Sequence, residues 1–279
     1  MNRKLIFLDI DGTLTEPGSN IPPSSAAEAV RRARENGNPV FLCTGRNFGM
    51  LKPVLKYGFD GVIASSGGYI CCGDEVIYDR PFTEEMKKRI FEALKEEGIY
   101  RTVECLDGAY MDEAFKRFLR ENAHEGSNSE LLRWRRQIEE SLNIRSMEEY
   151  KGQPVYKVIV MCRDERLLEQ AKKRLGDEVE FCMQEPDKFG YVNAEIISSE
   201  FNKGTGIVKV CGHLGISLEN TIAFGDSMND VEMMETAAYS VCMENGSSRL
   251  KALADEICPS VKEDGLLQAF KKHRLIQDA

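Results

Sequence analysis

Short apolar runs alternate with amphipathic stretches along the first third of the chain. Residues 4–8, 38–43 and 61–64 are apolar and have the length of buried strands, whereas residues 25–37 and 47–57 have helical character. An order of strand, helix, strand, helix, strand predicts a parallel sheet with helices on both faces. This part of the chain therefore predicts an α/β, Rossmann-like, doubly wound core.

Local signals support the first helix and predict a hairpin after the third strand. Ser25 and Glu28 have the spacing of a capping box, and Gly37 would close the helix that they open. After the third strand, residues 69–78 predict a hairpin that turns at Gly73-Asp74.

The pattern changes at Asp79-Arg80-Pro81. Residues 83–97 predict a helix with acidic residues in its first turn and Gly98 at its end, followed by a hairpin across Asp107-Gly108. Further strands are expected at 155–162, 179–183 and 191–197, and a further helix at 164–175. This mixture predicts a separate α+β domain with its own sheet.

We place that inserted domain at residues 83–185, between core segments 1–82 and 186–279, with hinges near Arg80-Pro81 and Glu185-Pro186. Within it, residues 131–136 form a basic cluster that either contacts an anionic substrate or belongs to a solvated helix face.

The core pattern resumes at Lys203, which opens a helix running to about Leu214. The elements expected after it are strands at 221–224, 239–242 and 256–259, and helices at 230–236, 247–254 and 263–271.

Composition narrows the classes of function. Lys and Arg number 37 and Asp and Glu 46, so the formal net charge is −9, which argues against non-specific binding to nucleic acid or to an anionic membrane. No apolar run approaches the length of a membrane span, and the first residues lack the character of a signal peptide.

The nine cysteines are scattered, and most of them lie in apolar runs, which favours reduced thiols in a cytoplasmic protein. We expect a monomer or a weak homodimer.

The first apolar strand ends in two carboxylates, Asp9 and Asp11, followed by Gly12 and Thr13. Reactive groups gather at the carboxyl ends of strands in open α/β sheets. Two acidic side chains so close together repel one another unless a cation or a proton lies with them. The alternative is an ordinary Asp-Gly turn, which requires neither the second aspartate nor the preceding strand.

Three later segments complete a pattern with Asp9-Ile10-Asp11-Gly12-Thr13. They are Thr44-Gly45-Arg46, Lys203-Gly204 and Gly225-Asp226-Ser227-Met228-Asn229-Asp230. In this order and spacing the chain resembles phosphatases of the haloacid dehalogenase superfamily, in the Cof-like subfamily IIB form with a large cap between the second and third motifs. The resemblance covers essentially the whole chain. It departs from the Cof-like pattern at Ser66-Gly67, where Asn-Gly is usual.

The resemblance implies a chemistry in which Asp9 is the nucleophile and Asp11 the general acid and base. Spacing alone would allow the opposite assignment of these two carboxylates. It also implies a phosphate-binding group, which comprises Ile10, Thr44, Gly45, Lys203 and Asn229. Taken alone, Thr44 has the character of a helix N-cap, and a lysine at a helix start is usually a surface residue.

A Mg²⁺ site is expected at the same strand ends. Asp9 and Asp226 would supply carboxylates, and by resemblance Asp11 would supply its main-chain carbonyl. Asp230, one helical turn from Asp226, would lie in the outer shell. The alternative for Asp226 and Asp230 is an interaction with a helix N-terminus. For Arg46 a substrate contact and a structural salt bridge remain equally open.

The function expected is Mg²⁺-dependent hydrolysis of small phosphorylated metabolites, such as sugar phosphates or nucleotide-cofactor phosphates, through an aspartyl-phosphate. Two alternatives remain. A phosphotransferase or mutase would use the same intermediate with a hydroxyl acceptor, and a regulatory protein would bind phosphate without turnover.

Overall fold

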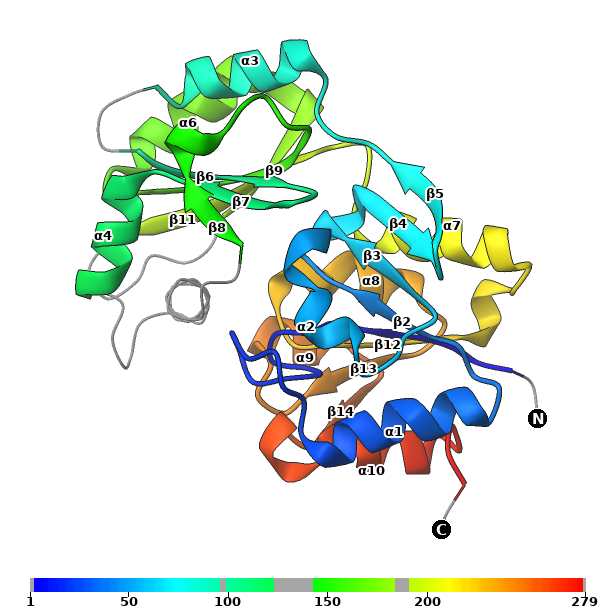
Figure 1. Ribbon diagram of the computed structural model, residues 1–279. Helices are drawn as coiled ribbons and strands as arrows, with labels where there is room; N and C mark the ends of the chain where they lie inside the picture. The colour runs from blue at the N-terminus through cyan, green and yellow to red at the C-terminus, as the bar shows by residue number, and fades with distance from the viewer. Residues whose placement is uncertain (1–2, 96–98, 123–142, 184–190, 278–279) are drawn as a thin grey trace. The chain divides into compact units, whose positions relative to one another are not determined.

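The structure is a computed structural model that describes residues 3–95, 99–122, 143–183 and 191–277. It divides into two compact units. The core unit comprises Met1–Arg46, Leu51–Asp79 and Phe201–Ala279, and the second unit comprises Asn47–Met50 and Arg80–Glu200. Each unit is built on its own sheet, as Figure 1 shows.

The core sheet has eight strands in the order β14-β13-β12-β1-β2-β3-β4-β5. They are β1 (Leu5–Leu8), β2 (Val40–Cys43), β3 (Gly61–Ala64), β4 (Tyr69–Cys72), β5 (Glu75–Asp79), β12 (Thr221–Gly225), β13 (Ser240–Met243) and β14 (Glu256–Cys258). All neighbours pair in parallel except β3 with β4 and β4 with β5, which are antiparallel pairs. Because β1 is central, its carboxyl end lies beside the ends of β2 and β12.

Helices cover both faces of the core sheet (Figure 1). They are α1 (Ser24–Glu35), α2 (Lys52–Leu55), α7 (Lys203–Leu214), α8 (Val231–Thr236), α9 (Ser248–Leu253) and α10 (Gly265–Lys272). Phe7 and Phe41 pack in one cluster with Val210 of α7 and Met233 of α8. The doubly wound α/β core predicted from the order of apolar runs is therefore confirmed.

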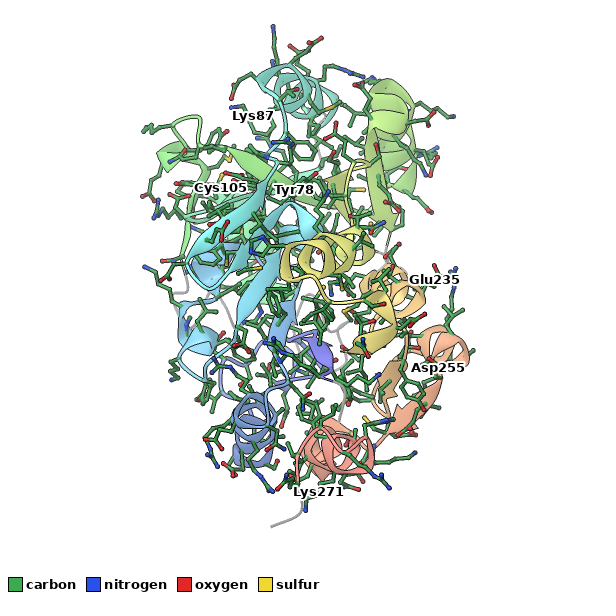
Figure 2. The ribbon with its side chains drawn as sticks, turned by 90° about the vertical axis from the view of Figure 1, so that its right-hand side faces the viewer. Tyr78, Lys87, Cys105, Glu235, Asp255 and Lys271 are labelled. Atoms are coloured by element: carbon green, nitrogen blue, oxygen red, sulfur yellow. The ribbon has the colours of Figure 1, made fainter. Side chains whose placement is uncertain are left out.

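The second unit has a six-stranded sheet in the order β10-β11-β9-β6-β7-β8. Its strands are β6 (Tyr100–Cys105), β7 (Gly108–Met111), β8 (Ile144–Ser146), β9 (Val155–Cys162), β10 (Val179–Met183) and β11 (Val192–Ser198), and its helices are α3 (Glu84–Ala93), α4 (Glu113–Asn122) and α6 (Glu165–Leu175). Apolar residues of α3 and α6 pack with one face of this sheet, while Phe115 and Phe118 of α4 pack with the other. Figure 2 labels Lys87 on α3 and Cys105 at the end of β6.

The boundary expected at residue 186 is wrong for the strand that follows it. β11 pairs antiparallel with both β9 and β10, so residues 192–198 belong to the second unit, and the core resumes at Phe201. The backbone N–H and C=O groups of β11 form their hydrogen bonds with β9 and β10, so a domain boundary before β11 would separate it from its partners. The proposed hinge at Glu185-Pro186 and the basic cluster at 131–136 lie outside the described residues, as does Gly98.

Two local predictions also need correction. Residues 47–57 do not form one helix: a 3₁₀ turn at Phe48–Met50 precedes α2, which has Pro53 in its first turn. A proline inside a continuous helix lacks the N–H that would bond to the carbonyl four residues earlier. That carbonyl, of Gly49, instead accepts from Asn143 Nδ2 at 2.9 Å. Similarly, Ser25 caps no helix, because α1 begins at Ser24 after Pro23.

Among the described residues, none of the helices has the length and apolar character required to cross a lipid bilayer.

Candidate active site

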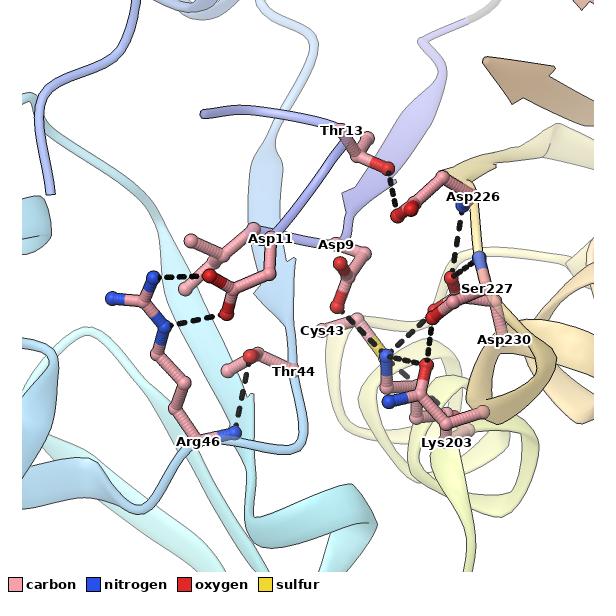
Figure 3. A network of polar contacts seen from close by, with 12 residues as sticks. Asp9, Asp11, Thr13, Cys43, Thr44, Arg46, Lys203, Asp226, Ser227 and Asp230 are labelled. Atoms are coloured by element: carbon pink, nitrogen blue, oxygen red, sulfur yellow. Dashed lines mark hydrogen bonds and ion pairs between the residues drawn. The ribbon is translucent and has the colours of Figure 1, made fainter. Parts of the chain in front are cut away.

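Two acidic side chains meet at adjacent strand ends in the core unit. Leu8 pairs with Phe224 in parallel register, and the N–H of Asp9 donates to the carbonyl of Phe224 at 3.0 Å. Asp9 and Asp226 each come directly after a strand, so their carboxylates point into the same space (Figure 3). Together with Asp230 they offer carboxylate oxygens that all lie within 4.8 Å of one another.

The turn after Asp9 is shaped to admit Asp226. Gly12 has φ of +90°, and a Cβ atom there would lie 2.3 Å from Asp226 Oδ2. Thr13 Oγ1 donates to Asp226 Oδ1 at 3.1 Å, and Asn245 Nδ2 donates to the carbonyl of Gly12 at 2.7 Å. Thr13 thus has a role that its sequence motif did not predict. Its place two residues after Asp11 was the available signal, whereas nothing in the sequence pointed to Asn245.

Lys203 is the buried cation of the site, with only 1% of its surface exposed. It opens α7, whose N-cap Asn202 accepts from the N–H of Thr205. Its Nζ donates to Asp9 Oδ1 at 2.8 Å and to Asp230 Oδ1 at 2.6 Å (Figure 3). The same Nζ lies 3.3 Å from Asn229 Oδ1. These contacts exclude the surface-lysine alternative.

Burial and charge together shift the ionisation of this group. Burial raises the pKa of Asp9 to about 7, although the nearby Lys203 ammonium opposes the shift. Burial, with repulsion from Asp9, also raises the pKa of Asp226 well above its ordinary range. Burial alone would lower the pKa of Lys203, but the carboxylates of Asp230 and Asp9 outweigh it and raise that pKa. The site thus has more negative charge than its one lysine neutralises.

Asp230 has both of its oxygens engaged by the protein. Oδ1 accepts from Lys203, and Oδ2 accepts from the backbone N–H groups of Asp226 at 3.0 Å and Ser227 at 3.1 Å. The side chain therefore holds the Asp226 loop and orients the lysine. These contacts are those of the helix-start alternative, and the outer-shell position of Asp230 beside a metal ion stays a prediction.

Arg46 is fully buried and grips Asp11. Its Nε lies 2.7 Å from Asp11 Oδ2 and its Nη2 lies 2.6 Å from Oδ1, a paired geometry that Figure 3 shows. Nη1 donates to Asn20 Oδ1 at 2.7 Å, and the N–H of Gly18 donates to Asp11 Oδ1 at 2.8 Å. Of the two alternatives for Arg46, the structure displays the salt bridge. Its partner Asn20, in a turn-rich segment without a motif, was not identified from the sequence.

The remaining candidate phosphate ligands surround the same strand ends. Thr44 follows β2 and is buried; its Oγ1 accepts from the N–H of Arg46 at 3.1 Å, which leaves its own proton for another acceptor. Asn229 uses Oδ1 to accept from Lys203 and Ser227, so its Nδ2 is the donor available to a ligand. Ile10 follows Asp9, and Gly45 follows Thr44, so their backbone N–H groups belong to the same two loops.

The loop after β3 supports this arrangement. Ser65 and Ser66 have φ of +50° and +56°, and Ser66 N–H donates to the carbonyl of Thr44 at 3.0 Å. Gly67 has φ of +110°, and a Cβ atom there would lie 2.4 Å from the carbonyl oxygen of Asn202. The departure from Asn-Gly thus falls on a loop that contacts both the Thr44 loop and the start of α7.

The donor set fits a small divalent cation. Asp9 and Asp226 offer oxygen only, and the Lys203 ammonium pairs with Asp9 and Asp230 but not with the third carboxylate, Asp226. Oxygen ligands with excess negative charge suit Mg²⁺. Because Asp230 is occupied by Lys203 and two N–H groups, Asp9 and Asp226 are the residues that would hold the ion.

Comparison with known proteins shows the family of this chain. The sequence profile of the haloacid dehalogenase-like hydrolases matches residues 6–270. Pyridoxal phosphate phosphatase YbhA of Escherichia coli is 26% identical over 98% of this chain and 99% of its own. The 5-amino-6-(5-phospho-D-ribitylamino)uracil phosphatase YwtE of Bacillus subtilis is 27% identical over 94% of this chain and 95% of its own.

Solved structures give the same result for the fold. The chain superposes on the HAD subclass IIB sugar phosphatase BT4131 with a TM-score of 0.77 at 25% identity, covering 98% of this chain and all of that one.

Proposed function

Because the chain belongs to the haloacid dehalogenase-like hydrolases and is a phosphatase of that superfamily, we propose that it hydrolyses small phosphomonoesters through an aspartyl-phosphate, with Mg²⁺ as cofactor. One observation carries the proposal: the carboxylates of Asp9 and Asp226 lie together at adjacent strand ends, with buried Lys203 against Asp9. Curated relatives act on pyridoxal phosphate and on a ribityl phosphate, so the substrate proposed is a phosphorylated metabolite of that size. We place this activity in the cytoplasm, since the nine cysteines are free.

The first chemical step transfers the phosphoryl group to the protein. An Asp9 oxygen attacks phosphorus, and the bond from phosphorus to the ester oxygen breaks. Asp11 gives its proton to the departing oxygen. One Asp11 oxygen leaves the paired contact to carry that proton, while the other stays bonded to Arg46, which keeps the carboxyl group in position. Donors from Lys203, Thr44, Asn229 and the N–H groups of their loops would neutralise the phosphoryl oxygens.

The second step returns Asp9 to its starting state. Asp11, now ionised, takes a proton from water while the water oxygen attacks phosphorus and the bond from phosphorus to Asp9 breaks. Phosphate leaves, and Asp11 is again protonated. When bound, Mg²⁺ supplies positive charge to the phosphoryl oxygens and to the two carboxylates that would hold it.

The test uses purified protein with p-nitrophenyl phosphate, with and without EDTA and added Mg²⁺. We expect chelation to abolish phosphate release and Mg²⁺ to restore it, and Asp9→Asn to lower kcat by at least about 10³-fold. Asp74→Asn is the control, because Asp74 is an exposed carboxylate in the β4–β5 turn. Unchanged turnover in Asp9→Asn would refute the assignment of the nucleophile.

A second experiment addresses the covalent intermediate. In Asp11→Asn, an aryl phosphate still loses its good leaving group, but water attack lacks a base, so phosphoenzyme should accumulate. Mass spectrometry after acid quench would then show the added phosphoryl group on the peptide containing Asp9.

Product analysis separates hydrolysis from transfer: a phosphotransferase would release less phosphate than phenol when a hydroxyl acceptor is present.

A further inference from the structure

The loop between β13 and α9 contacts both of the loops that would hold the cation. On one side, Asn245 Nδ2 donates to the carbonyl of Gly12 at 2.7 Å. On the other side, the N–H of Ser247 donates to the carbonyl of Asp226 at 2.8 Å. Gly12 directly follows Asp11 in the first of these loops. The β13–α9 loop therefore connects the backbones of the two strand ends that carry the acidic residues.

The same loop is also hydrogen-bonded to the segment at the edge of the core sheet. The N–H of Glu244 donates to the carbonyl of Cys258, the last residue of β14, at 2.8 Å. Asn245 Oδ1 accepts from the N–H of Val261 at 3.3 Å. Both ends of the Asn245 amide are thus engaged by backbone groups of segments that are far apart in the sequence. The Gly12 turn is consequently held by the edge of the sheet as well as by β1.

Gly246, between the two contacts, lies directly against the backbone of Asp226. A Cβ atom at Gly246 would lie 2.9 Å from the Asp226 carbonyl oxygen and 2.7 Å from Cys242 Sγ. The N–H of Gly246 donates to the carbonyl of Met243 at 2.8 Å, which closes the turn after β13. Because no space separates the two backbones, a displacement of this loop would also displace Asp226.

We propose that Asn245 is a positioning residue, and that the loop of residues 244–247 sets the separation of Asp9 and Asp226 and thereby the affinity of the site for a divalent cation. This inference rests on the proposed function, in which Mg²⁺ is the cofactor. Mg²⁺ demands near-octahedral geometry, so the positions of its oxygen ligands determine how tightly it is held. Residues that orient metal ligands without touching the ion commonly change metal affinity by about 10–100-fold.

The alternative for Asn245 is a purely structural role, and the two roles have different consequences. The Asn245 side chain is exposed, so its hydrogen bonds compete with water and their loss should lower the melting temperature only slightly. A structural role would change the melting temperature and leave metal affinity alone. A positioning role changes metal affinity out of proportion to stability.

The experiment measures Mn²⁺ binding to the full chain without substrate, from the electron paramagnetic resonance signal of the free ion, with Mg²⁺ as competitor. Mn²⁺ prefers the same oxygen ligands as Mg²⁺. We expect Asn245→Leu to raise the Kd of Mn²⁺ about tenfold. With p-nitrophenyl phosphate, kcat of this variant should fall at low Mg²⁺ and recover at saturating Mg²⁺, with KM unchanged. An unchanged Kd for Mn²⁺ would overturn the proposal.

Asn38→Leu is the matched control. Asn38 also uses both ends of its amide on backbone groups, since Nδ2 donates to the carbonyl of Leu275 and Oδ1 accepts from the N–H of Lys4, both at 2.9 Å. It precedes β2, whereas the site lies beyond the other end of that strand. Because Asn38 is buried, this variant should lower the melting temperature at least as much as Asn245→Leu, with an unchanged Kd for Mn²⁺. Equal weakening of Mn²⁺ binding by both variants would reflect a general loss of stability and overturn the proposal.

Gly246→Ala tests the contact of the loop with Asp226. The added Cβ atom would displace the Asp226 carbonyl, so we again expect a Kd for Mn²⁺ about tenfold higher than that of wild type. Gly212→Ala on α7 is its control, because nothing lies within 4 Å of the added atom, and its Kd should equal that of wild type. An unchanged Kd in Gly246→Ala would refute the role of the loop in placing Asp226.

Metal binding and turnover are measured separately, so this inference and the proposed function fail in different ways. If Asn245→Leu binds Mn²⁺ about tenfold more weakly than wild type but neither releases phosphate from any ester, the phosphatase proposal fails and the positioning role stands. If phosphate is released and the Kd for Mn²⁺ is the same in wild type and both loop variants, the positioning role alone fails. A wild-type protein that binds no Mn²⁺ would also refute the positioning role.

Discussion

At the scale of single residues, the carboxylates of the site repel one another, and a bound cation would reduce that repulsion. Asp9, Asp226 and Asp230 lie close together, and Lys203 pairs with Asp9 and Asp230. Burial of Asp9 and Asp230 limits the screening of this repulsion by water. The raised pKa of Asp9 is the thermodynamic expression of this arrangement. Between about pH 4 and pH 7, the folded, metal-free protein therefore keeps a proton on Asp9 that the unfolded chain releases.

The first prediction concerns the pH dependence of that metal-free protein. The pKa of Asp9 is about 7 when folded, against 3.8 as its ordinary value, so between these pH values the folded state binds more protons. The contribution of Asp9 to stability should therefore fall as pH rises from about 4 to 7. In EDTA at pH 8, Asp9→Asn should be more stable than wild type by about 1–3 kcal/mol.

Thermal or urea unfolding at pH 5 and pH 8 measures this difference. Mg²⁺ should stabilise wild type more than Asp9→Asn, because ligand binding to the folded state alone raises its stability. A wild-type protein that gains stability from pH 5 to pH 8 in EDTA, relative to the variant, would contradict the sign.

The second prediction concerns the buried lysine. Lys203→Met leaves the carboxylates of Asp9 and Asp230 without their common cation, and we expect a loss of about 3–5 kcal/mol in the free energy of unfolding at pH 7. The control is Lys209→Met on the same helix, where the ammonium lies 4.2 Å from the Tyr78 ring centroid. That change should cost less than about 1 kcal/mol. If both variants lose a similar free energy of unfolding, the buried ion pairs of Lys203 contribute no more to stability than the contact of Lys209.

The third prediction separates a positioning role of Arg46 from a substrate contact. Arg46→Lys cannot reproduce the paired contact with Asp11, so delivery of the proton to the leaving oxygen should suffer. We expect kcat to fall about 10–100-fold for an alkyl phosphate and much less for an aryl phosphate, whose leaving group needs no acid.

Arg34→Lys provides the matched control, because Arg34 contacts Asp60 through Nε and Nη2 at 2.9 and 3.1 Å on the surface. It should leave both rates unchanged. If Arg46→Lys lowers kcat/KM equally for alkyl and aryl phosphates, through a higher KM, then Arg46 is a substrate contact instead.

At the scale of elements, the site depends on turns that hold backbone in conformations rare for side-chain-bearing residues. Ser65 and Ser66 both have positive φ in the loop after β3. Such conformations cost roughly 1–3 kcal/mol each and persist only where the surroundings enforce them. Here the surroundings are the Thr44 carbonyl and the first residues of α7, so the loop connects the ends of β2 and β3 to the helix that presents Lys203.

The fourth prediction tests this connection at Gly67. Gly67→Ala adds a Cβ atom 2.4 Å from the Asn202 carbonyl oxygen at φ of +110°, which displaces the start of α7. We expect the free energy of unfolding to fall by about 2–4 kcal/mol. We also expect a reduced kcat, because the start of α7 presents Lys203. Gly73→Ala is the control: its φ is +57°, and nothing lies within 4 Å of the added atom.

That control should lose only about 1 kcal/mol, with kcat unchanged. Ser66→Asn should be neutral or stabilising, because asparagine tolerates positive φ better than serine. Chemical denaturation and steady-state kinetics measure both quantities. An effect of Gly67→Ala no larger than that of Gly73→Ala would show that the loop does not position α7.

At the scale of the whole molecule, the chain forms two units with separate sheets and separate apolar clusters. The main segment of the second unit runs from Arg80 to Glu200, and the short segment Asn47–Met50 also belongs to that unit. Its last strand, β11, pairs with two neighbours and belongs wholly to the inserted sheet.

The fifth prediction follows from this division. Replacing residues 80–200 by a short Gly-Ser linker should leave a core that unfolds cooperatively and hydrolyses p-nitrophenyl phosphate slowly. Deleting only 83–184 would leave β11 without β9 and β10, exposing its strand edges and apolar face, so that protein should aggregate. Size-exclusion chromatography and circular dichroism distinguish the two. Similar behaviour of both deletions would contradict the boundary at Phe201.

The sequence by itself determined the doubly wound core and the residues that gather at its strand ends, because apolar runs, helix signals and acidic residues after strands are local features. Asp9 and Asp226 could be placed together since parallel register aligns neighbouring strand ends. Long-range contacts appear only in the folded chain: the pairing of Arg46 with Asp11, the place of β11 in the second sheet, and the ion pairs of Lys157 with Glu104 and Glu195. Periodicity identifies a buried strand but not its partner, so the choice between two sheets depends on packing between residues far apart in the chain.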